Sequence, residues 1–419
     1  MNSIFIKISS ACVLVLIFMS QFVPTAYVGV KAVLLVIGGG GVSVAMIRGK
    51  LFLLKWQVLG IFFLVTCGIL YSTYGFVRGN PGAIRVLSVW LLWPIVYLGF
   101  STLLRQCNGY ESLVKIFKLS LAGVVFYGFL YLGYMAGIVP DWLYIDLDQG
   151  QEIGFHDGYV EYNLYSISSL IFLFPFFSHY LLEKYKRGRG LRVDDMLLWF
   201  ASIILVLLTG RRALFFIVLI LPVIVFFSNK LLANDRKINI RISGLIVVSL
   251  CSAGFLYLFY RFGLRLDSVI AMFVDGFDFG SGSGSASERA WQYNALIDGW
   301  LNSSIAFGAG NGAAAAVSRS EIFPWAYELT YVYLLFSTGL VGVVVYFGWY
   351  GYGLNRLRRA IRARPDLAVY AAPILTGSLS LGIAAATNPY FGKFDYLWML
   401  LLPFFISGWA RYQRVVEFR

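Results

Sequence analysis

Long apolar runs alternate with short polar connections along the whole chain. Most runs have roughly the 17–25 residues that a helix needs to cross the hydrocarbon core of a membrane, and ten-residue segments of strand-like alternation are absent from the sequence. The pattern predicts an all-α, polytopic integral membrane protein, with one membrane domain over 1–419. About twelve transmembrane helices are expected, at 4–23, 27–47, 52–72, 86–104, 113–138, 162–182, 195–209, 213–229, 243–260, 327–352, 367–386 and 396–410.

The composition agrees with this class of protein. Hydrophobic residues make up 59% of the chain and charged residues 13%, whereas a soluble domain has about 25% charged residues. The four cysteines have neither metal-ligand spacing nor the arrangement of a disulfide framework. The run at 4–23 is not followed by a clear small-residue cleavage site, so it is interpreted as a retained first span rather than a signal peptide.

The basic residues predict the orientation. Connections 183–189, 229–241 and 355–364 are rich in Lys and Arg, and with twelve spans they lie on the same side as both termini. That side carries a net charge of +17 and the other −4, which together give the chain's +13. Because cytoplasmic loops are enriched in Lys and Arg, the first side is predicted to be cytoplasmic. The positive charge therefore needs no nucleic-acid partner.

Two substantial loops then lie outside, at 139–161 and 261–326. The smaller loop is acidic and aromatic, a composition found both in carbohydrate-contacting surfaces and in the aromatic belt at the membrane interface. In the larger loop, residues 288–302 have apolar side chains near helical spacing. This indicates an amphipathic helix, which either lies at the membrane interface or forms a plain cap over the bundle.

Arginines on the external side are unexpected under the positive-inside rule. Arg211 and Arg212 occupy a turn of about three residues between two predicted spans, so both guanidinium groups are expected at the headgroup level. Such a pair can bind a phosphate or pyrophosphate in forked geometry, or it can anchor the helices by snorkelling to lipid headgroups. The spans lack ionisable residues near their middles, which argues against an ion-coupled transporter but not against a lipid flippase.

A glycine-rich segment, GAGNG, follows at 308–312. A nucleotide-binding loop is a weak interpretation, because no predicted strand precedes the segment. Gly310 and Gly312 are better explained by a tight turn, or by main-chain N–H groups that approach an anion.

Taken together, these motifs resemble the O-antigen polymerase and ligase family of bacterial envelope enzymes, over residues 195–350. The matching motifs are TGRRAL at 209–214, RAW at 289–291, GAGNG at 308–312, and Glu328 followed by GLVG at 339–342. The ligase branch usually has a histidine near Tyr327 or Glu328. This chain has none there, which favours the polymerase branch.

The resemblance implies a glycosyltransferase of the GT-C-like membrane type. It would join oligosaccharide repeat units carried on undecaprenyl pyrophosphate at the periplasmic face of the bacterial inner membrane, by metal-independent, inverting transfer without a cofactor. Other implied partners are membrane lipids and a chain-length regulator protein. A ligase that transfers glycan to lipid A core, and a non-enzymatic flippase or exporter of lipid-linked glycan, remain alternatives.

Residue roles follow from the motifs. Arg211 or Arg212, Arg289, Gly310 and Gly312 are expected at the pyrophosphate. Glu328 is the candidate base that orients or deprotonates the acceptor hydroxyl, beside Arg289; the alternative is an interfacial carboxylate paired with an arginine. The motif neighbours Trp291 and Tyr327 are expected to contact glycan.

Overall fold

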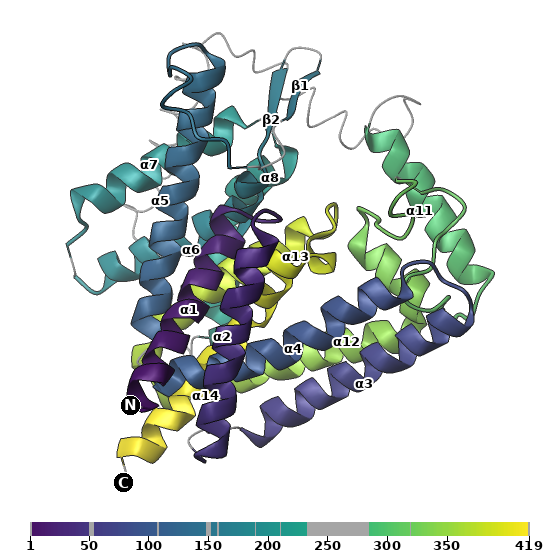
Figure 1. Ribbon diagram of the computed structural model, residues 1–419, viewed down its shortest axis with the longest axis horizontal. Helices are drawn as coiled ribbons and strands as arrows, with labels where there is room; N and C mark the ends of the chain where they lie inside the picture. The colour runs from purple at the N-terminus through teal and green to yellow at the C-terminus, as the bar shows by residue number, and fades with distance from the viewer. Residues whose placement is uncertain are drawn as a thin grey trace.

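The computed structural model describes residues 2–49, 54–106, 109–147, 152–156, 159–188, 190–209, 211–232, 285–318 and 320–417. This part of the chain is helical, apart from one small hairpin (Figure 1). The helices are α1 (Asn2–Phe22), α2 (Val28–Ile47), α3 (Lys55–Val77), α4 (Ala83–Gln106), α5 (Gly109–Met135), α6 (Leu170–Lys186), α7 (Val193–Leu208), α8 (Arg212–Leu232), α11 (Ser285–Leu301), α12 (Thr330–Ala363), α13 (Ala368–Ala384) and α14 (Phe394–Glu417).

Nine helices in the described ranges are long and apolar enough to cross a membrane. The fold is therefore that of a multi-pass membrane protein, as the apolar runs predicted. Each predicted span that falls in these ranges coincides with a helix, although α7 and the apolar part of α14 are shorter than the nine. The run at 243–260 lies outside the described residues, so the count of twelve spans stays a prediction.

The centre of the bundle is built on α13, which packs against α6, α8 and α14. Small residues along α13 allow this close approach. A Cβ atom added at Gly377, for example, would lie 2.8 Å from the carbonyl oxygen of Phe172 on α6. Helices that meet in a membrane gain little from hydrophobic burial, so close backbone packing of this kind is what holds them together.

The connections between helices gather at two opposite ends of the bundle. At one end, here called the loop end, turns that are distant in sequence bond to one another. The Thr330 hydroxyl donates to the Asn388 carbonyl, and the Tyr396 hydroxyl donates to the Tyr165 carbonyl. The described parts of the connections at this end are 23–27, 78–82, 136–147, 164, 209, 211, 302–318, 320–329 and 385–393, together with the hairpin. These are the connections that the charge pattern predicts to be external, and the opposite end is called the basic end.

The smaller loop contains regular structure that the apolar pattern did not predict. Strands β1 (Glu152–His156) and β2 (Tyr159–Asn163) pair antiparallel, with Glu152 opposite Asn163. The preceding part of the loop packs on α5, where the Tyr144 ring stacks on Tyr134 at 4.1 Å between centroids. The hairpin adds two short strands to a chain that was expected to be all-α. Period-two alternation over five residues is too short to stand out beside apolar helices.

The larger loop is anchored by a break in α12. Gly339 has φ of 63°, which interrupts the helix. The carbonyl groups of Phe336 and Ser337 accept hydrogen bonds from the N–H groups of Ala309 and Gly310. Hydrogen bonds from the loop therefore replace the bonds that these two carbonyl groups would make within an unbroken helix. Without them, the carbonyl groups would be buried unsatisfied at a cost in free energy. In Figure 1, α12 runs beside α3 and α4, and α11 covers the end of this group of helices.

Helix α11 confirms the amphipathic helix expected within 288–302. Leu296 is fully buried against α12, whereas Trp291 on the other face is 54% exposed. Gly299 permits the contact, because a Cβ there would lie 2.7 Å from the ring of Phe336. Whether the exposed face meets lipid stays a prediction.

Candidate functional site

An ion pair joins the two parts of the larger loop that the sequence singled out. Arg289 Nε donates to Glu328 Oε2 at 2.8 Å, although 39 residues separate them in sequence. Arg289 lies on α11, and Glu328 lies two residues before the first residue of α12. A carboxylate close to a helix N-terminus is stabilised by the helix dipole. With Glu328 only 8% exposed, the pair is shielded from water and its electrostatic energy is correspondingly larger.

Arg211 is held in the turn between α7 and α8. Its Nη1 donates to Ser168 Oγ at 2.6 Å, and its Nη2 to the carbonyl of Leu164 at 3.4 Å. The turn itself is stabilised by the Arg211 main-chain N–H, which donates to Thr209 Oγ1. These contacts fix the guanidinium of Arg211 beside the segment that leads into α6. Arg212, the first residue of α8, is half-buried.

Tyr390 is close enough to both Arg211 and Glu328 for their charges to act on it. It lies in the short 3-10 helix Tyr390–Gly392 between α13 and α14, and it is buried. Burial raises the pKa of Tyr390 above its ordinary value, the nearby charge of Arg211 and a hydrogen bond with Ser168 lower it, and the charge of Glu328 raises it. Both Arg211 and Glu328 therefore act electrostatically on one hydroxyl group. We call Arg211, Ser168, Arg289, Glu328 and Tyr390 the arginine cluster.

A buried ion pair holds the turn that carries Tyr390. Lys31 Nζ lies 2.9 Å from Asp395 Oδ1, and the other carboxylate oxygen of Asp395 accepts the Thr25 N–H. Lys31 also donates to the carbonyl of Val23. Because breaking a buried pair leaves an uncompensated charge, this contact ties the start of α14 to the turn between α1 and α2.

Sequence reasoning missed Tyr390, Ser168 and the Lys31–Asp395 pair. Each is a common residue type near the end of an apolar run, which is where tyrosine, serine and charged residues are ordinarily found. The sequence places these residues near the external side of the predicted topology, but the same is true of every other external residue, so this position could not single them out.

Tyr327 and Trp291, both expected at the glycan, differ in their exposure. Tyr327 is only 2% exposed, its hydroxyl accepts the Ala315 N–H, and its ring stacks on Tyr333. It therefore has little exposed surface, and its contact with glycan stays a prediction. Trp291, by contrast, has the exposure that such a contact requires.

The glycine-rich segment packs against helices rather than lining an anion site. The N–H of Gly310 donates to the Ser337 carbonyl and is not available to an anion. The carbonyl of Gly312 accepts the N–H of Gly82, and a Cβ at Gly312 would lie 2.0 Å from the nitrogen of Ala83. The close approach of backbones explains both glycines, and pyrophosphate binding by Gly310 and Gly312 stays a prediction.

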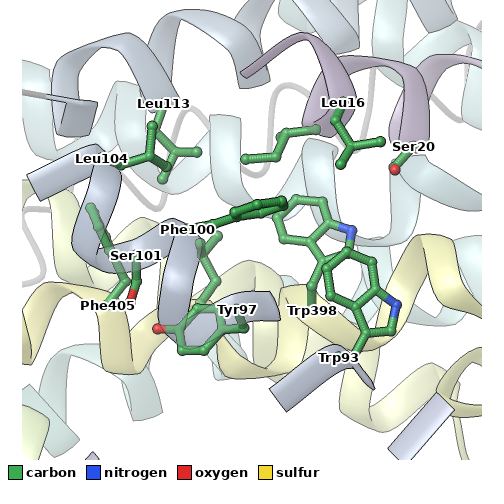
Figure 2. A pocket seen from close by; sticks show the side chains of 12 residues that line it. Leu16, Ser20, Trp93, Tyr97, Phe100, Ser101, Leu104, Leu113, Trp398 and Phe405 are labelled. Carbon is green, nitrogen blue, oxygen red and sulfur yellow. The ribbon is translucent and has the colours of Figure 1, made fainter. Parts of the chain in front are cut away.

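A separate small cavity lies inside the bundle, between α1, α4, α5 and α14. Figure 2 shows Trp93, Tyr97, Phe100 and Trp398 around it. Its volume of about 30 Å³ is suited to a water molecule rather than to a substrate. The indole N–H of Trp93 and the hydroxyl of Ser20, two of the lining residues, have no hydrogen-bond partner among the described residues. The arginine cluster is not part of this lining.

No protein-family model matches the chain, and no curated protein matches it either.

Proposed function

We propose that the chain is a polymerase that joins oligosaccharide repeat units carried on undecaprenyl pyrophosphate. The observation that carries the proposal is the arginine cluster. Arg211, held by Ser168, and the Arg289–Glu328 pair come from different elements, and the charges of Arg211 and Glu328 both act on Tyr390, at the end of the bundle predicted to be external. Fixed guanidinium groups beside a carboxylate are what a transfer reaction from a pyrophosphate-linked donor needs.

In this mechanism the acceptor hydroxyl attacks the anomeric carbon of the donor sugar. The bond from that carbon to the pyrophosphate oxygen breaks with inversion, and the electron pair stays on the pyrophosphate of the lipid. Arg211 or Arg212, together with Arg289, binds this leaving group and stabilises the charge that develops on it. Removal of one well-placed donor of this kind costs about 10²–10³ in rate.

Glu328 takes the proton from the acceptor hydroxyl. Arg289 holds one oxygen of the carboxylate through its Nε, so the group is oriented before the acceptor arrives. A guanidinium has five N–H donors, and the remaining donors of Arg289 serve the pyrophosphate. The same side chain thus orients the base and binds the leaving group.

The position of the histidines supports a polymerase over a ligase. His179 is buried in α6, where it bonds to Thr376 and Asn229, and His156 lies in β1. Neither is next to Glu328 in sequence, where the ligase branch usually has its histidine. The proposal includes the bacterial inner membrane as the location, with both termini cytoplasmic and the arginine cluster facing the periplasm.

The test uses the purified full-length protein with short lipid-linked repeat units as the only substrate. Products are sized by gel or mass spectrometry, without nucleotide sugars or added metal. We expect a ladder spaced by one repeat unit, and its loss in Arg289→Ala. Arg358→Ala, an exposed arginine at the basic end of α12, is the matched control and should keep the ladder.

Unchanged repeat units with the wild-type protein would overturn the polymerase assignment. Transfer to an added lipid A core acceptor would then identify a ligase, and movement of intact lipid-linked glycan across proteoliposomes would identify a flippase. A ladder that persists in Arg289→Ala would refute the role of the arginine cluster.

A further inference from the structure

A second cavity lies at the opposite end of the bundle, between α5, α6 and α7. Its volume is about 170 Å³, which is room for a group much larger than one water molecule. Its lining includes the basic side chains of Lys115, Lys118, Lys184 and Arg192 and the aromatic rings of Phe176 and Tyr180. Basic side chains and aromatic rings therefore share one concave site.

The positive charge of this site exceeds the negative charge that neutralises it. Asp195 pairs with both Lys118 and Lys184, and Asp194 pairs with Lys118 and Arg192. Lys115 is exposed and has no ion pair among the described residues. Four cations are thus set against two carboxylates, and a bound group with one or two negative charges would balance the site.

The apolar side of the cavity has its own chemistry. Phe176 and Phe177 are buried at its base, and the Phe176 ring stacks on Tyr180 with 6.2 Å between centroids. A hydrated inorganic anion gains nothing from such a surface, whereas the glycerol and upper acyl part of a lipid would be in contact with it.

The surroundings of the cavity are apolar and exposed. Leu119, next to Lys118 on α5, and Leu197, two residues after Asp195 on α7, are both exposed large hydrophobic side chains. In a membrane-spanning bundle, exposed leucines on a helix face lipid. The cavity therefore lies beside the region where lipid headgroups meet the protein.

We propose that this cavity binds the phosphate group of an anionic phospholipid, with Lys115, Lys184 and Arg192 around the phosphate and the Phe176–Tyr180 wall against the glycerol and acyl region. Basic pockets between membrane helices on the cytoplasmic side bind such headgroups, and the charge pattern predicts that this end is cytoplasmic. The proposal is independent of the polymerase assignment.

The test compares lipid binding by the purified full-length protein in detergent, measured by native mass spectrometry. Cardiolipin and phosphatidylglycerol should bind at lower concentrations than phosphatidylethanolamine. In the double variant Lys115→Gln/Lys184→Gln, the affinity for the anionic lipids should fall roughly 30-fold, the effect expected from two basic residues near an anionic headgroup. Asp195 keeps Lys118 as a partner in this variant, so the fold should be retained.

Arg358→Gln/Arg359→Gln is the matched control, because it removes two charges from the same end of the bundle at exposed positions of α12. It should bind the anionic lipids as the wild type does. Equal losses in the two double variants, or no loss in the first, would overturn the proposal.

Competition with inorganic phosphate shows whether the ligand of the cavity is a phospholipid or any group that carries a phosphate. If millimolar phosphate displaces the lipid, the site recognises the phosphate group itself and takes it from a lipid or from solution. If it does not, the acyl and glycerol contacts are required and the ligand is the lipid. Equal affinity for phosphatidylethanolamine and phosphatidylglycerol would refute recognition of an anion.

Discussion

The Arg289–Glu328 pair allows the sharpest test of the site. Both side chains are mostly buried, at 22% and 11% exposed, and Nε and Oε2 are 2.8 Å apart. A hydrogen bond between charged groups contributes about 1.5–3 kcal/mol, and replacing one partner leaves the other charge unpaired. We therefore expect Arg289→Gln and Glu328→Gln each to lower the free energy of unfolding, and the double variant to lose less than the sum of the two. The expected coupling energy is about 1.5–3 kcal/mol.

The coupling would be measured by equilibrium unfolding of the purified protein in mixed detergent micelles. The Arg364–Asp366 pair at the basic end is the matched control, with Asp366 55% exposed and a distance of 3.1 Å. An exposed pair of this kind is worth only about 0.2–1 kcal/mol. A coupling energy for Arg289 and Glu328 no larger than that of the control would refute the claim that this ion pair is shielded from water and strengthened by burial.

The same variants separate catalysis from stability. Glu328→Gln keeps the size of the side chain but cannot accept a proton, so polymer formation should fall about 10²–10⁴-fold, the usual contribution of a general base. Polymer formation within threefold of wild type, in a variant that remains folded, would exclude Glu328 as the base and leave it a structural partner of Arg289.

Three further predictions follow from particular contacts. Arg211→Lys retains the charge but not the pair of hydrogen bonds to the Ser168 hydroxyl and the Leu164 carbonyl, so polymer formation should fall by about 10²–10³-fold; unchanged product ladders would contradict this. Burial raises the pKa of Tyr390 above its ordinary value of 10. As the pH rises above 10, Tyr390 ionises in the unfolded chain before it ionises in the folded protein, so the free energy of unfolding should fall. Tyr390→Phe should reduce that fall when unfolding is measured as a function of pH. Gly339→Ala would place a Cβ 2.4 Å from the carbonyl oxygen of Ala306 at φ of 63°, and we expect a loss of about 1–3 kcal/mol in unfolding measurements, whereas Gly348→Ala, with nothing within 4 Å, should be neutral or stabilising.

The positions of the helices could be read from the sequence because they depend on a local property. A helix satisfies its backbone hydrogen bonds within its own segment, and an apolar run of sufficient length is stable in hydrocarbon wherever its neighbours lie. The apolar runs therefore located helices such as α1 and α12, and the 3.6-residue pattern located α11. The grouping of connections at two ends followed from the alternation of spans.

The membership of the site could be predicted only in part. Arg289 and Glu328 were singled out separately, but their ion pair depends on α11 folding back over the start of α12. The sequence could not show that Arg211 belongs to the arginine cluster, because that follows from its hydrogen bond to Ser168 in the segment before α6. Such contacts depend on how helices pack, and hydropathy contains no information about that.

The structure differs most from the sequence-based predictions where polar groups of one element bond to a distant element. The glycine-rich segment had the composition of an anion-binding loop, but the N–H groups of Ala309 and Gly310 donate to carbonyl groups at the break of α12 near Gly339. Likewise, Lys31 and Asp395 pair across 364 residues. The sequence by itself determined which segments are helical and which residues share an end of the bundle, because those depend on local apolar length. Only the tertiary structure decided which polar groups meet, because in a membrane each buried donor or charge is satisfied by whichever partner the packing of the helices brings within reach.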